Sequence, residues 1–314
     1  MMNLVPLEAT PLVDFDVIIG HKEEPRRSIL RRLRPRLGRL YRIYTIARWE
    51  LAGLPRSSAY FGDRHARAAI LGSHAYRSAG KKDPPPRSSF QVPEREALLQ
   101  CYDGDTRGLT EMLDRVRQLQ PLKQRWRCQY CCGVSASSTW DHYVHKAHFP
   151  EFSVYPPNLI PSCDKCNEFK KAWIKYGKRT CINFYYDRFD PTRPLIAAKI
   201  EIAADGDPEA TFFLARRYVL NTRFGRLLAR HWRMLQLERR LRDAAPATLV
   251  AIQSYIEVHA DDIHVSATVL AQELASMAKK LGQALGANHI QTVLYRAAAA
   301  SPTLIAYYLR EGRT

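Results

Sequence analysis

Residues 128–171 read CQYCCGVSASSTWDHYVHKAHFPEFSVYPPNLIPSCDKCNEFKK, and this stretch decides the fold of the middle of the chain. Two Cys-x-x-Cys pairs enclose most of it, Cys128 with Cys131 and Cys163 with Cys166. Four thiolates are enough to close a tetrahedral zinc site of the structural kind. The spacing therefore predicts a Zn²⁺ ion that these four cysteines hold as scaffold.

The chain has seven cysteines, so three lie outside this pattern. Cys132 is adjacent to Cys131 and could replace it, although the spacing favours Cys131 as the ligand. Cys101 and Cys181 are expected to be free thiols, buried or partly buried. An odd cysteine count without a recognisable signal peptide argues against a secreted disulfide framework. We therefore expect a reducing, cytoplasmic location.

Three polar signals lie between and beside the cysteine pairs. The first is Asp141 directly before His142. In an extended strand these two side chains would point to opposite faces, so they could converge on one phosphate only where the strand ends or bulges. The others are Asn158, which precedes a leucine, and Asn167, which follows Cys166 at the start of an expected helix.

The order Cys-x-x-Cys, Asp-His, Asn, Cys-x-x-Cys-Asn-x-x-Lys resembles the HNH endonuclease family, whose fold is the ββα-metal (His-Me) finger. The resemblance covers roughly residues 126–175, about a sixth of the chain. The four cysteines match the zinc-binding subset of the family. Asn167 stands where the family has its final histidine or, in many members, an asparagine, so the resemblance implies an H-N-N variant.

The resemblance implies a role for each matching residue. His142 would be the general base that activates the attacking water, and Asp141 would bind a divalent metal. Asn158 would fix the loop and orient the base, and Asn167 would be the second protein ligand of the metal. Carboxylate and amide oxygens suit a hard ion, so we expect Mg²⁺, with Mn²⁺ as a substitute. The candidate contacts to nucleic acid are Lys146, Lys165, Lys170 and Lys171.

The charge balance favours a polyanionic partner. The chain has 48 Lys and Arg against 31 Asp and Glu, a net charge of +17. Such a surplus is typical of proteins that bind nucleic acid, although it also serves general solubility. Residues 25–50 combine many arginines with apolar residues at helical spacing, which predicts a basic amphipathic helix, bent or restarted at Pro35. Its arginines would face DNA or a partner, or would be solvated.

The predicted fold class is mainly α with a small α+β insert, the HNH finger with its four-cysteine zinc site. Residues 1–93 would form a basic, largely helical region that ends in a Pro/Ser-rich linker. Residues 94–194 would hold a helix and the nuclease domain, and residues 195–314 a C-terminal helical bundle, in which residues 227–241 form one long helix. The residues expected to form another helix there are Phe212, Phe213, Ala215, Tyr218 and Val219.

The sequence therefore predicts a metal-dependent HNH endonuclease that hydrolyses phosphodiester bonds of DNA. The segment PEFSVYPPNLIPSCDKCN looks like the finger of HNH proteins of bacterial anti-phage defence systems, some of which work beside an ATPase. A partner protein of that kind, or a second copy of the chain, is expected. No apolar run approaches the ~18 residues of a membrane helix. Two alternatives stay open: a non-catalytic, zinc-stabilised nucleic-acid-binding module, and an HNH-type RNase.

Overall fold

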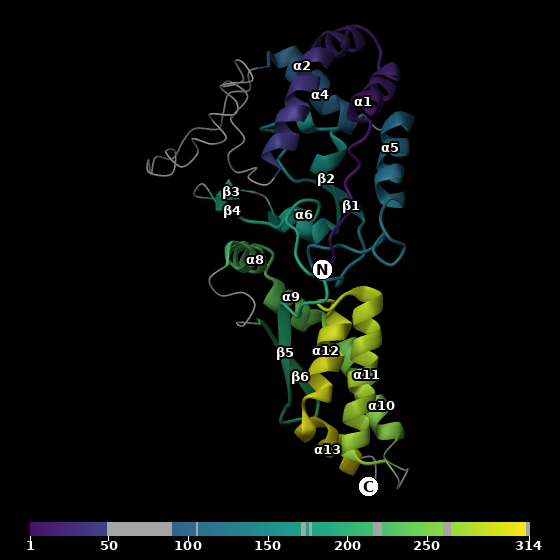
Figure 1. Cartoon of the computed structure of the whole chain (residues 1–314), viewed down its shortest axis with the longest axis vertical. Helices are drawn as coiled ribbons and strands as arrows, with labels where there is room; N and C mark the ends of the chain where they lie inside the picture. The colour runs from purple at the N-terminus through teal and green to yellow at the C-terminus, as the bar shows by residue number, and fades with distance from the viewer. Residues whose placement is uncertain are drawn as a thin grey trace. The chain divides into compact units, whose positions relative to one another are not determined.

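The structure, a computed structural model, is mostly helical, with three small antiparallel sheets of two strands each in the part of the chain that it describes (Figure 1). This confirms the prediction of a mainly helical chain. The described residues are 1–48, 90–104, 106–170, 174–175, 178–215, 222–259 and 265–311. The chain divides into two compact units. The N-terminal unit comprises Leu4–Arg125 and Ser138–Arg188, and the C-terminal unit comprises Met1–Asn3, Trp126–Ser137 and Phe189–Thr314.

The N-terminal unit begins with helices α1 (Pro11–Gly20) and α2 (Arg26–Ala47), which pack against each other. Helix α2 runs as one helix through Pro35 rather than restarting there. Its buried stripe has the spacing of one helical face. The residues of that stripe are Leu30, Leu33, Leu37, Leu40, Tyr41 and Tyr44. The exposed side of the helix carries arginines, as the sequence predicts.

Two further helices, α4 (Val92–Asp103) and α5 (Arg107–Gln118), follow in this unit. Helix α4 ends at its C-cap residue, Gly104. The hydroxyl of Thr106 caps α5 by accepting a hydrogen bond from the Leu109 N–H. Helix α4 packs on α2, and α5 on α1. Most of the predicted linker, residues 78–89, lies outside the described residues.

A short hairpin and a helix complete the centre of the N-terminal unit. Strands β1 (Thr139–His142) and β2 (Leu159–Ser162) pair antiparallel, with Asp141 opposite Ile160 and His142 opposite Leu159. Turns η4 (Pro150–Phe152) and η5 (Pro156–Asn158) lie in their connection. Helix α6 (Asp164–Lys170) follows β2 after one residue and packs on β1. A two-residue pair, β3 (Ile174–Lys175) and β4 (Lys178–Arg179), comes next.

The C-terminal unit contains a hairpin where the sequence predicts only helices. Strands β5 (Ile196–Ile202) and β6 (Pro208–Leu214) pair antiparallel around a turn in which Gly206 has φ +90°. The helix predicted from Phe212 and Phe213 is therefore wrong. Phe212 is 1% exposed and Phe213 is 47% exposed, which is the two-residue alternation of a strand. Ala215 follows the strand, and residues 216–221 lie outside the described part.

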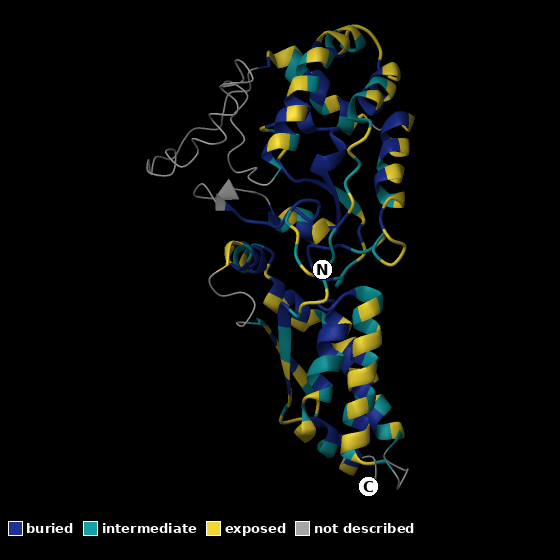
Figure 2. Ribbon diagram, in the orientation of Figure 1, coloured by how far each residue is buried: buried dark blue, intermediate teal, exposed yellow. Residues whose placement is uncertain are grey.

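Helices pack around this hairpin. Helix α9 (Leu237–Ala244) and helix α10 (Pro246–Val258) contact β6, and α12 (Ile290–Ala299) contacts β5. Helix α11 (Ala267–Leu285) lies along α12 and presents an exposed stripe on its other side (Figure 2). The remaining helices are α8 (Arg223–Met234) and α13 (Pro302–Glu311). Among the described helices, none is both long and apolar enough to cross a membrane.

The first cysteine pair lies on a tight loop of the C-terminal unit. The Cys128 N–H donates to the Ser135 carbonyl at 3.1 Å, and Cys132 and Gly133 both have positive φ, 59° and 80°. A Cβ atom on Gly133 would lie 2.3 Å from Cδ2 of His289. Glycine is therefore required here by both backbone conformation and space.

We expect Gly133→Ala to lower the free energy of unfolding by about 2–4 kcal/mol, because it combines a left-handed alanine with a steric clash. Chemical denaturation followed by circular dichroism measures this. Gly282→Ala is the matched control: its Cβ would meet nothing nearer than 3.5 Å, inside helix α11. This control should gain about 0.5–1 kcal/mol. Equal stability of Gly133→Ala and the natural chain would contradict the steric argument.

Candidate functional site

Four buried cysteines form a cluster able to hold a metal ion. The sulfur atoms of Cys128, Cys131, Cys163 and Cys166 all lie within 4.8 Å of one another. Ligands at a Zn–S distance of ~2.3 Å around a tetrahedral ion are about 3.8 Å apart, so the cluster fits a structural metal such as Zn²⁺ after slight contraction. Cys131 belongs to the cluster and the adjacent Cys132 does not, as the spacing predicts. The predicted four-cysteine cluster is confirmed.

Cys101 and Cys181 are buried thiols outside any disulfide, as expected. The Cys101 thiol donates a hydrogen bond to the Ala97 carbonyl within α4. Burial raises the pKa of each of the two thiols to about 12. Both therefore stay protonated at neutral pH and are poor nucleophiles and poor metal ligands.

His142, the predicted general base, ends strand β1 with its ring buried. Its Nε2 lies 2.8 Å from the main-chain carbonyl oxygen of Ser153. A carbonyl oxygen only accepts hydrogen bonds, so Nε2 carries the proton and Nδ1 keeps its lone pair. The Tyr102 ring packs edge-on against the imidazole, with ring centroids 4.4 Å apart. The ring is thus held in one orientation and one tautomer.

The electrostatic surroundings of His142 keep it neutral. Burial is the largest cause and lowers the pKa of the imidazole to about 4, while the hydrogen bond to Ser153 opposes this shift. A neutral imidazole with a free Nδ1 lone pair is the form that can accept a proton.

Ser153 is itself anchored by helix α4. Its hydroxyl donates a hydrogen bond of 2.6 Å to the Leu98 carbonyl. The side chain of Ser153 therefore holds the loop on α4 while its main chain holds His142. The prediction from sequence named neither Ser153 nor Tyr102, because a main-chain carbonyl carries no sequence signal.

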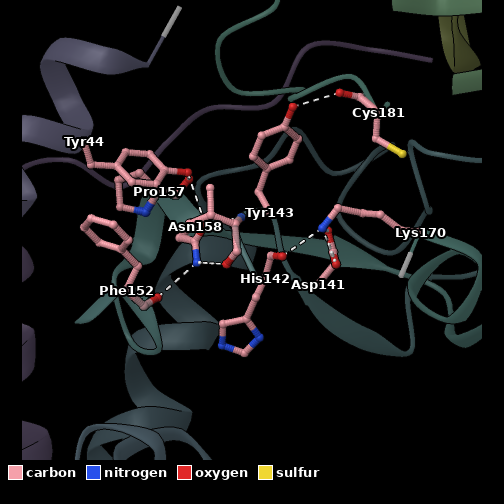
Figure 3. A network of polar contacts seen from close by, with 10 residues as sticks. Tyr44, Asp141, His142, Tyr143, Phe152, Pro157, Asn158, Lys170 and Cys181 are labelled. Carbon is pink, nitrogen blue, oxygen red and sulfur yellow. Dashed lines mark hydrogen bonds and ion pairs between the residues drawn. The ribbon is translucent and has the colours of Figure 1, made fainter. Parts of the chain in front are cut away.

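Asn158 fastens the connection between β1 and β2 (Figure 3). Its Oδ1 accepts hydrogen bonds from the Val144 N–H at 2.8 Å and from the Tyr44 hydroxyl at 3.2 Å. Its Nδ2 donates to the Val144 and Phe152 carbonyls, each at 3.1 Å. These bonds occupy both donors and both acceptor sites of the amide. Asn158 thus ties the start of the loop, its middle and helix α2 together, in the place where the resemblance expects a loop-fixing residue.

Asp141 lies in a buried ion pair. Its two carboxylate oxygens are 2.8 Å and 2.7 Å from the Nζ of Lys170, which also donates to the main-chain oxygen of His142 at 2.8 Å. Asp141 is 3% exposed and Lys170 is 4% exposed. Three oxygen atoms therefore surround one ammonium group. In Figure 3 the imidazole of His142 points away from this group, as strand alternation requires.

This ion pair bears directly on the predicted magnesium ligands. Asp141 and the half-buried Asn167 offer oxygen donors that a hard cation prefers. The ammonium of Lys170 shows that a positive charge fits against Asp141. A metal ion at this carboxylate would have to displace Lys170. The sequence assigned Lys170 to the DNA-facing surface, whereas the structure places it in the interior.

The other lysines predicted to contact nucleic acid differ in their surroundings. Lys146 pairs with Asp103, and its ammonium lies 4.7 Å from the centroid of the Tyr102 ring. Lys165 is exposed on α6. Lys171 lies outside the described residues.

We expect Cys163→Ser to abolish stoichiometric zinc binding, because the site would lose one of its four thiolates. Elemental analysis of the purified protein measures the zinc content per chain. Cys181→Ala is the control, since Cys181 is equally buried but lies outside the cluster. Retention of a full zinc equivalent by Cys163→Ser would exclude this cysteine as a ligand.

We expect Lys170→Met to lower the free energy of unfolding by about 3–5 kcal/mol, because it leaves the Asp141 carboxylate buried without its counter-ion. Urea denaturation measures the change. The double variant Asp141→Asn/Lys170→Met should recover most of the loss, since it removes both charges. A loss that persists in the double variant would assign the effect to packing rather than to the ion pair.

Comparison with known proteins adds one short similarity. No protein family matches the chain, and no solved structure matches it. Among curated proteins, Protein ea31 of Escherichia phage lambda is 42% identical to this chain over 48 residues. The match covers 15% of this chain and 16% of the phage protein, so the chain spans about a sixth of that relative's length.

Proposed function

We propose that this chain is a metal-dependent HNH-type endonuclease that hydrolyses phosphodiester bonds of DNA. The observation that carries the proposal is the state of His142: its Nε2–H donates to the Ser153 carbonyl, which leaves Nδ1 unprotonated with its lone pair. The chain order of β1, β2 and α6 supports it, as does the cysteine cluster, because both agree with the resemblance of the sequence to the family.

In this proposal His142 takes a proton from the attacking water through Nδ1. General bases of this kind contribute ~10²–10⁴-fold to a reaction. Ser153 acts indirectly, because its carbonyl sets the tautomer that leaves Nδ1 free. Asn158 holds the loop that positions Ser153. The base therefore depends on residues that do not touch the substrate.

Asp141 and Asn167 would hold the divalent metal of the proposed enzyme. When bound, the metal supplies charge neutralisation for the phosphate and the leaving oxygen. Because Lys170 contacts both oxygens of Asp141, occupancy of this carboxylate by a metal ion requires Lys170 to move.

The same ion pair favours a second candidate function, a zinc-stabilised nucleic-acid-binding module without catalysis. If the Asp141–Lys170 pair never opens, the chain has a scaffold metal and basic surfaces but no place at Asp141 for a second ion. An HNH-type RNase stays a further alternative. The anti-phage role, the ATPase partner and self-association also stay predictions, since the phage lambda match covers only 48 residues.

We expect the zinc-loaded protein to nick or linearise supercoiled plasmid with Mg²⁺ or Mn²⁺ and to be inactive in EDTA. His142→Ala should reduce the rate by about 10²-fold or more, because it removes the general base. Agarose gels of a time course measure this. His21→Ala is the matched control, because His21 is an exposed histidine at the end of α1.

Three results would count against the nuclease proposal. Cleavage that His142→Ala leaves unchanged would remove His142 as the base. Cleavage of RNA but not of DNA would favour the RNase. Binding of both without cleavage, by protein with full zinc content, would favour the non-catalytic module.

A further inference from the structure

Helices α8 and α9 of the C-terminal unit carry a strong positive charge. Residues 222–245 contain seven arginines against two acidic residues. The leucines of this segment are buried, whereas five of its seven arginines are exposed: Arg223, Arg226, Arg233, Arg239 and Arg242. The buried residues of these helices include Leu227, Leu228, His231, Leu235, Leu237 and Leu241.

A groove lies where these two helices meet. Its volume is about 340 Å³, and its lining residues are Trp232, Arg233, Gln236, Glu238, Arg239 and Arg242. The bend that forms it is at Gln236, which has φ 50° and ψ 42°, in the left-handed region. A residue other than glycine is uncommon in this conformation. The break also explains why the long helix predicted for residues 227–241 is two helices.

The groove has a surplus of fixed positive charge. Arg233, Arg239 and Arg242 are exposed, and Glu238 is the acidic residue among the lining side chains. Arg239 has a carboxylate oxygen of Asp243 at 4.0 Å, in a pair whose two side chains are both more than 60% exposed. Such exposed pairs contribute little and exchange readily for a stronger anion.

We propose that this groove binds the sugar-phosphate backbone of double-stranded DNA. Guanidinium groups form forked, charge-assisted hydrogen bonds to phosphate oxygens, and three arginines line this groove. The indole N–H of Trp232 can only donate, which also suits an anionic ligand. Contacts to phosphate fix the register of a protein on the duplex without carrying sequence information, so the contribution of the groove is to position the duplex rather than to select a sequence.

The inference deepens the proposed function, and it rests on that function only in the choice of DNA as the polyanion. A helical surface outside the β1–β2–α6 segment would hold the substrate, while His142 would act on it. The groove and the proposed catalytic residues come from separate parts of the sequence, so each can be disabled without altering the other.

The test is equilibrium binding of a fluorescent 30-base-pair duplex, measured by anisotropy with the His142→Ala protein in EDTA, so that cleavage does not interfere. The groove variant is Arg233→Glu/Arg239→Glu/Arg242→Glu. The control variant, Lys279→Glu/Lys280→Glu/Arg310→Glu, changes the net charge by the same amount at exposed positions on α11 and α13. Circular dichroism and zinc content confirm that each protein is folded.

We expect the groove variant to bind at least about 30-fold more weakly at 0.1 M salt, and the control to stay within about threefold. The slope of log affinity against log salt should fall by about 2–3 in the groove variant, one unit for each lost phosphate contact. Equal weakening in both variants would mean general attraction and would overturn the proposal. Unchanged DNA binding by the groove variant would also overturn it and would favour an acidic protein as the ligand.

The two proposals fail separately. If the natural chain binds DNA through the groove but does not cleave it with Mg²⁺ or Mn²⁺, the nuclease proposal fails and the groove stands. If the chain cleaves plasmid and the groove variant binds and cleaves like the natural chain, the groove proposal fails alone.

Discussion

The saturated amide of Asn158 is the interaction on which the candidate site depends. It closes the connection between β1 and β2 by bonding to Val144 at one end and Phe152 in the middle, and it bonds to Tyr44 of α2. Because Phe152 precedes Ser153, this closure places the carbonyl that orients His142. A substitution of Asn158 would therefore alter the orientation of the His142 imidazole, although the two side chains do not contact each other directly.

Much of this site was predictable because its chemistry is tied to residue type and spacing. Only cysteines supply thiolates, and two Cys-x-x-Cys pairs are typical of structural zinc sites. Strand alternation correctly separates the side chains of Asp141 and His142. The partners of those residues were not predictable. Lys170 has a long side chain whose direction depends on tertiary packing, and Ser153 contributes an atom that every residue possesses.

Secondary structure was harder to predict from the sequence where a segment fits both helical and strand periodicity. Phe212 and Phe213 match a helical stripe in a short window, but pairing with β5 buries only one of them. The break between α8 and α9 at Gln236 was not predictable, because no glycine or proline marks it in the sequence. By contrast, helix α2 continues through Pro35, because burial of its long apolar stripe outweighs the loss of one main-chain hydrogen bond.

For the proposed metal site, the Asp141–Lys170 pair means that a cation would reach the carboxylate only by displacing a tethered ammonium group. A tethered ammonium is present at the carboxylate at a high effective concentration, whatever the surrounding salt. If a divalent ion replaced the ammonium, Lys170 would stay attached to helix α6, so the ion would add its charge to this region without releasing a counter-ion to the solvent.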